Sequence, residues 1–158
     1  MYQGVLIGIL ATVMLDVWAW VVKHGLKLPT ANWALVGRWI AYMPKGQFFH
    51  RPVADSTPLR HELAIGWTAH YLIGAVYGLV YLAIVRGVLV TEPTLLSALI
   101  FALVTLAAPW LIMQPGMGAG VFASKTPRPN ITRLVNLSMH LVYGLGLYLA
   151  WRLLQLNS

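Results

Sequence analysis

Residues 63–85 read LAIGWTAHYLIGAVYGLVYLAIV, a run of 23 residues that contains no Asp, Glu, Lys or Arg. A helix that crosses a bilayer needs about 20 mostly apolar residues, because each residue adds about 1.5 Å against a hydrocarbon core of about 30 Å. Three further segments meet this requirement, namely residues 2–22, 95–114 and 134–154. Strands of a transmembrane barrel would be about half as long and would alternate in polarity. The sequence therefore predicts an all-α polytopic membrane protein with four transmembrane helices.

The composition supports the same class. Of the 158 residues, 59% are hydrophobic and only 9% are charged, whereas a soluble domain carries about 25% charged residues. The length allows one transmembrane domain over residues 1–158 and no second, soluble one. The chain contains no cysteine, which excludes disulfides, thiolate metal sites and cysteine nucleophiles.

The basic residues predict the orientation. Loops 23–62 and 115–133 hold nine of the eleven Lys and Arg residues, which are Lys23, Lys27, Arg38, Lys45, Arg51, Arg60, Lys125, Arg128 and Arg133. Under the positive-inside rule both loops are cytoplasmic, and both termini lie outside. The net charge of +7 indicates contact with anionic lipids at the cytoplasmic face. Nucleic acid is not an expected partner, because the charges are spread over two loops.

The first of these loops, residues 23–62, contains a further expected helix. Its large apolar side chains recur at helical spacing at Trp33, Val36, Trp39, Ile40 and Met43. The pattern predicts a short interfacial helix that lies among the lipid headgroups and ends at Pro44. The three histidines of this loop are expected in solvent or among headgroups; they are His24, His50 and His61.

A repeated motif links the two halves of the chain. Residues 68–74 read TAHYLIG and residues 138–144 read SMHLVYG, so that each has a hydroxyl, a histidine two residues later and a glycine four residues after that. The repetition predicts two helical hairpins related by an axis along the membrane normal, as in some transporters.

Polar residues inside the spans are predicted to form one layer. Asp16, His70 and His140 each lie seven or eight residues from a charged residue at the cytoplasmic end of the span, which is a depth of about 10–12 Å. Gln114 lies nearer the same face. An ionised Asp near the centre of a span costs about 2.5–3.5 kcal/mol, so these side chains are expected to turn inward and meet.

Three functional classes are compatible with this layer. The favoured one is a small proton-linked transporter or permeation protein that acts as a homo-oligomer, with the layer as its protonatable site. The second is a redox protein or an accessory subunit of a membrane complex. In it, His70 and His140 would ligate a b-type haem, or would bind a divalent metal together with Asp16. The third is a structural assembly partner, in which these bonds only hold helices together. An enzyme is less favoured, because no Ser-His-Asp set or carboxylate pair is expected near water.

Residues 115–120 read PGMGAG and end the third span. Gly116, Gly118 and Gly120, with Lys125 nearby, are compatible with an anion-binding nest of backbone N–H groups. The alternative, which we favour, is a tight turn without a ligand.

Five short motifs extend over the chain. They are GRW at 37–39, MPKG at 43–46, GWTAHY at 66–71, MQPGMGAG at 113–120 and ASKTP at 123–127. Through these motifs the chain resembles, over nearly its whole length, an uncharacterised family of small bacterial inner-membrane proteins, known as a domain of unknown function. The resemblance implies four helices and a bacterial cytoplasmic membrane, and no activity. It directs attention to Arg38 and Trp39 in the first motif, and to His70, Gln114 and the glycines of residues 116–120.

Overall fold

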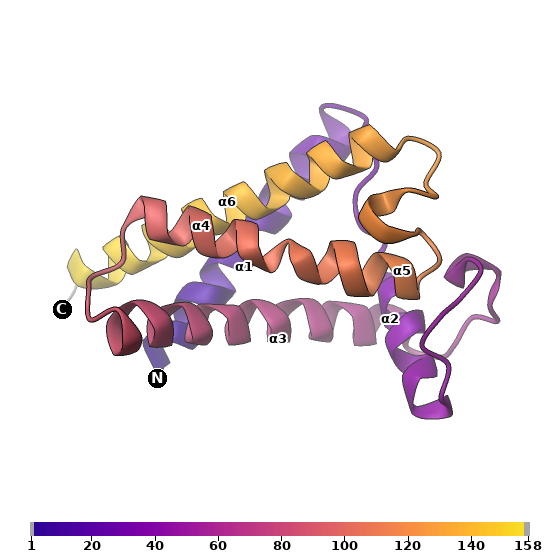
Figure 1. Cartoon of the computed structure of the whole chain (residues 1–158), viewed down its shortest axis with the longest axis horizontal. Coiled ribbons are helices and arrows are strands. Elements are labelled where there is room, and N and C mark those ends of the chain that lie inside the picture. Colours follow the sequence, from indigo (N-terminus) through magenta and orange to yellow (C-terminus); the bar gives the residue numbers. More distant parts are fainter. Residues whose placement is uncertain (1, 157–158) are drawn as a thin grey trace.

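The computed structural model describes residues 2–156, and this part of the chain is helical without any strand (Figure 1). The long helices are α1 (Tyr2–His24), α3 (Glu62–Leu82), α4 (Leu95–Thr105) and α6 (Pro129–Leu156), and the short ones are α2 (Trp33–Tyr42) and α5 (Gln114–Gly116). A π-helical turn extends α3 to Val88, and another, Pro109–Met113, joins α4 to α5. The prediction of an all-α fold is confirmed.

Four helical segments within residues 2–156 are long and apolar enough to cross a membrane. They are Tyr2–His24, Glu62–Val88, Leu95–Gly116 and Pro129–Leu156, close to the ranges expected from the sequence. Their faces carry exposed large apolar side chains, such as Leu72 and Val104, which suits contact with lipid. The architecture thus fits a multi-pass membrane protein.

The chain places its long loops at one end of the bundle. Figure 1 shows the start of α1, the end of α6 and the connection between α3 and α4 at one end, and α2 with the remaining loops at the other. The end with α2 carries the nine basic residues of the two long loops. Arg86 and Arg152 lie at the first end. We call the end with α2 the loop end.

Helix α1 occupies the centre of the bundle. It packs against α3 on one side and α6 on another, while α4 packs against α6 and α2 against α3. The buried core combines small and large side chains from all four long helices; it includes Ile7, Ala11, Tyr81, Ala98, Ala102, Tyr143 and Leu147.

The contact between α1 and α3 is made largely by backbone atoms. Its residues recur every fourth position, and therefore lie on one face of each helix: Gly4, Gly8, Thr12 and Asp16 on α1, and His70, Gly74 and Gly78 on α3. A Cβ atom on Gly78 would lie 2.6 Å from the Cα of Gly8, and one on Gly4 would lie 2.8 Å from the Cα of Leu79. Small residues at this spacing let membrane helices approach closely. We call these seven residues the glycine ladder.

The second helix pair has a related contact. A Cβ atom on Gly144 in α6 would lie 2.9 Å from the carbonyl oxygen of Ala98 and 3.0 Å from the Cβ of Ala102, both in α4. Its counterpart in the repeated motif, Gly74, faces Thr12 of α1. In both halves the glycine four residues after the histidine therefore contacts the preceding span. The repeat axis itself stays a prediction.

Prolines accompany two irregular segments of the chain. The turn at Pro109–Met113 is π-helical, because proline lacks the N–H that continues an α-helix and widens the local hydrogen-bond pattern. Pro44 lies in the 3₁₀ turn Met43–Lys45 that follows α2, as predicted for the end of that helix.

The short helix predicted in the first long loop is α2. It crosses α3 in direct contact, which the sequence did not predict. A Cβ atom on Gly37 would lie 2.6 Å from the backbone nitrogen of Gly66, and one on Gly66 would meet the carbonyl group of Trp33. Two glycines, one on each helix, make this crossing possible, and the apolar periodicity of α2 alone does not reveal it.

Substitution in the glycine ladder tests its role in stability. We expect Gly78→Ala to lower the free energy of unfolding by about 1–3 kcal/mol, because the new methyl group would overlap the backbone of α1. The matched control is Gly87→Ala near the end of the same helix, where a Cβ atom meets nothing within 4 Å. Thermal unfolding in detergent, followed by circular dichroism, would measure both. Equal stability of the two variants would contradict the ladder.

Candidate functional site

Asp16 and His70 meet at the end of the glycine ladder nearest the loops. The His70 Nε2 atom lies 2.8 Å from Asp16 Oδ1, within hydrogen-bond distance, and the Tyr71 hydroxyl donates a hydrogen bond of 2.8 Å to Asp16 Oδ2. Each carboxylate oxygen thus has a partner on α3, as a carboxylate in an apolar environment requires. The sequence prediction that these two polar residues share one level and face each other is met by the geometry.

Aromatic rings cover His70. The Trp33 ring stacks on the imidazole with centroids 4.0 Å apart and planes inclined by 30°, and the Trp67 ring meets it edge-on at 5.6 Å. Trp33 is the first residue of α2, so the crossing of α2 over α3 places this cover. The imidazole is therefore enclosed by rings on α2 and α3 and by the carboxylate on α1.

The two members of the pair differ in accessibility. The His70 side chain is 9% exposed and the Asp16 side chain 20% exposed. Asp16 is therefore the more accessible member of the pair. Because a carboxylate and an imidazole joined by a hydrogen bond can share one proton and accept another, the pair has the chemistry of a proton-binding site.

The other residues predicted for the polar layer do not join this pair. The Nδ1 atom of His140 lies 3.0 Å from the Asn136 carbonyl oxygen on its own helix. Gln114 is buried, and its Oε1 atom has no hydrogen-bond partner within the part of the chain that the structure describes. At this level a hydrogen bond joins α1 to α6 through other residues: Trp18 Nε1 donates to the Ser138 hydroxyl at 3.1 Å.

The geometry gives little support to the haem and metal alternatives. Within residues 2–156, no group of three His, Cys, Asp or Glu side chains could hold a metal ion, so Asp16, His70 and His140 do not form the ligand set considered above. For haem, the Nε2 atom of His70 is engaged by Asp16 and its ring face by Trp33. Ligation through Nε2 would require the contact with Asp16 to break.

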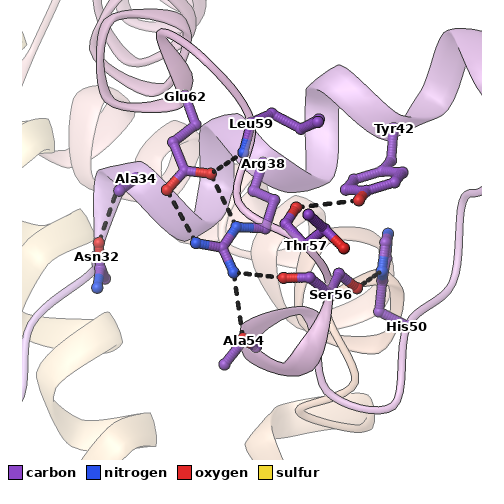
Figure 2. A network of polar contacts seen from close by, with 10 residues as sticks. All are labelled: Asn32, Ala34, Arg38, Tyr42, His50, Ala54, Ser56, Thr57, Leu59 and Glu62. Atoms are coloured by element: carbon purple, nitrogen blue, oxygen red, sulfur yellow. Dashed lines mark hydrogen bonds and ion pairs between the residues drawn. The ribbon is translucent and has the colours of Figure 1, made fainter.

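A second polar cluster lies around Arg38, shown in Figure 2. The guanidinium donates to both Glu62 oxygens, from Nε at 2.8 Å and from Nη2 at 2.9 Å. Its Nη1 donates to the carbonyl oxygens of Ala54 at 3.1 Å and Ser56 at 2.8 Å. The hydrogen bonds to Glu62 raise the pKa of Arg38 above its usual value, which keeps it a cation. Arg38 therefore joins α2, the start of α3 and the loop between them.

The loop after α2 is anchored to the glycine-rich segment. The Trp39 Nε1 atom donates to the Phe48 carbonyl at 2.9 Å, and the Trp39 ring faces Gly116, where a Cβ atom would lie 2.6 Å from that nitrogen. Two backbone bonds join the loops directly: the amide of His50 donates to Gly116 and that of Val53 donates to Met117, each at 2.9 Å. The two long loops therefore form one connected layer.

The expectation that His50 is solvated is wrong. Its residue surface is 6% exposed, its Nδ1 lies 2.7 Å from the Ser56 hydroxyl, and its ring meets the Tyr42 ring edge-on at 5.3 Å (Figure 2). The loop folds back on α2 because Arg38 holds two of its carbonyl groups. A histidine in a basic loop carries no local signal of such burial.

Several residues of the site escaped sequence reasoning. Gly4 and Gly8 have the small-xxx-small spacing of helix contacts, and this signal could have identified them as the surface that meets α3. Glu62 lies four residues before Gly66 and eight before His70, and is thus on the same face of α3. Its pairing with Arg38 has no such local signal, because the partners are 24 positions apart.

Fold and site together define a small helical bundle of multi-pass membrane type, with a carboxylate–imidazole pair inside and an ordered loop layer at one end. Residues 5–154 match the family described as "Protein of unknown function (DUF2938)". The chain belongs to this family, and the expected resemblance to an uncharacterised domain family is confirmed. No curated protein and no solved structure matches the chain.

The role of Arg38 can be tested by Arg38→Lys. Lysine keeps the charge but loses the planar fork that binds Glu62 through two bonds. We expect hydrogen exchange of the amides of residues 53–59 to accelerate on the order of tenfold. Arg60→Lys is the control, since Arg60 is exposed and has no part in this cluster. Unchanged exchange in the Arg38 variant, measured by mass spectrometry, would show that the loop is ordered without it.

Proposed function

We propose that this chain is a small proton-linked transporter or permeation protein, in which Asp16 and His70 form the protonatable site. The single observation that carries the proposal is the 2.8 Å contact between the Asp16 carboxylate and His70 Nε2 inside a bundle of apolar helices. Intramembrane ionisable residues that pair with each other are characteristic of proton relays in pumps and transporters.

The chemistry of the pair supports coupling. With one proton shared, the hydrogen bond between Asp16 and His70 joins α1 to α3. A second proton neutralises the carboxylate while the imidazole stays protonated, which removes the ionic attraction between the two helices. The aromatic cover from Trp33 then links this change to α2 and to the loop layer. Proton binding thus alters the packing of three helices.

The orientation follows from the charge asymmetry. With nine Lys and Arg residues in the two long loops, the loop end faces the cytoplasm and both termini lie outside. A bacterial cytoplasmic membrane is the proposed location, with anionic lipids around the loop end. Because four helices enclose little space, a second copy of the chain completes the pathway.

Proteoliposomes with an entrapped pH indicator provide the functional test. Small organic cations, anions and neutral solutes are added in turn, and a solute that moves with protons changes the internal pH. We expect Asp16→Asn and His70→Gln each to reduce this change at least tenfold, because neither variant keeps a carboxylate beside an imidazole. Tyr71→Phe keeps the pair and should retain part of the activity.

His140→Gln is the matched control for the histidine variant. It makes the same substitution in the repeated motif of α6, at a residue that bonds to Asn136 of its own helix. It should transport like the unmodified protein. If no solute changes the internal pH, or if the change persists in Asp16→Asn, the proposal is wrong.

A further inference from the structure

An open cleft lies between the two long loops at the loop end. It has a volume of about 640 Å³ and is lined by Phe49, His50, Arg51, Pro115, Gly118, Gly120, Val121, Ser124 and Lys125. Three of the four residues considered for a nest, Gly118, Gly120 and Lys125, thus reach the cleft, whereas Gly116 faces Trp39. The residues come from both loops, so the cleft exists only because the loops are joined.

The charge of the cleft is of one sign. Arg51 and Lys125 are exposed, and within residues 2–156 neither side chain forms an ion pair or a hydrogen bond. No carboxylate lines the cleft. At this end of the bundle the acidic side chains are Asp55 and Glu62, and Glu62 is already engaged by Arg38. Two cations without a counter-charge on opposite loops are the arrangement that an oxyanion would neutralise.

The remaining lining adds hydrogen-bonding capacity and a fixed shape. The Ser124 hydroxyl lies beside Lys125 in the sequence, and on the other loop His50 is held in place by its bond to Ser56. Gly118 allows the loops to meet, because a Cβ atom there would lie 2.7 Å from the His50 carbonyl oxygen. Gly120 allows its own loop to close on Lys125, since a Cβ atom there would lie 2.9 Å from Lys125 Cγ.

The backbone beside the cleft is strained. Phe122 and Ala123 have φ values of 52° and 56°, and the φ values of Gly118 and Gly120 are 87° and 76°. The left-handed region is uncommon for a bulky residue such as Phe, and such strain clusters at ligand-binding segments. Phe122 and Ala123 belong to a short 3₁₀ turn, Val121–Ala123, which directly precedes Ser124 and Lys125.

From these observations we infer that the cleft binds a phosphate-type oxyanion, held between Arg51 of one loop and Lys125 of the other. The ligand chemistry is a phosphate group, which both a soluble phosphate compound and the headgroup of an anionic phospholipid provide. The site is separate from the Asp16–His70 pair and does not depend on the proposed transport.

The test measures two phosphate sources. The protein is placed in nanodiscs of phosphatidylcholine and titrated with inorganic phosphate by calorimetry. In a second arm, phosphatidylglycerol is included, and native mass spectrometry counts the lipid molecules retained by the protein. The variants are Arg51→Gln and Lys125→Gln. Arg128→Gln is the matched control, because it removes one exposed charge from the same loop as Lys125 but outside the cleft.

The expected loss is about tenfold in affinity for each cleft variant, since each removes one charge-assisted hydrogen bond. Phosphate binding that is lost in these variants and kept in Arg128→Gln supports a soluble ligand. If phosphate does not bind, but retention of phosphatidylglycerol falls in the cleft variants alone, the ligand is a lipid headgroup. If both cleft variants equal Arg128→Gln in both arms, no site exists and the inference is overturned.

Discussion

The close approach of α1 and α3 is the constraint on which the rest of this structure depends. Between membrane helices there is no hydrophobic driving force, so packing and hydrogen bonds must hold them. Gly4 and Gly8 on α1 meet Gly74 and Gly78 on α3 backbone to backbone. This contact fixes the level of the next residues along the same faces, and it brings Asp16 to His70. A carboxylate in this environment is tolerable because that partner, together with Tyr71, is already in place.

The same face of α3 also organises the loop end. From His70 towards the loop end, this face of α3 continues to Gly66, where α2 crosses, and to Glu62, which binds Arg38. Arg38 also binds two carbonyl groups of the following loop. The packing of the helices therefore also fixes the position of that loop. The internal pair and the cleft between the loops thus rest on one stripe of residues at intervals of four. A packing defect in this stripe would disturb both.

Part of this account could be predicted from the sequence, and the reason is physical. Hydropathy and length locate the four spans, and distance from the charged ends places Asp16 and His70 at one depth. The depth of a residue in the bundle does not tell which way its helix is rotated about its own axis. For this reason the sequence did not predict that His140 bonds within α6 and does not meet Asp16. Contacts between residues that are far apart in the sequence are also absent from the sequence prediction. The pairing of Arg38 with Glu62 and the burial of His50 depend on how a loop folds back, and no local pattern encodes that.

The most direct test of the central claim is a distance measured in a lipid bilayer. Solid-state NMR with ¹³C in the Asp16 carboxyl group and ¹⁵N in the His70 ring can record their dipolar coupling. The 2.8 Å contact between Asp16 Oδ1 and His70 Nε2 predicts a measurable coupling, which should weaken when Gly78→Ala separates the helices. Absence of coupling in the folded, unmodified protein would show that α1 and α3 do not present these side chains to each other, and the proposed site would be lost.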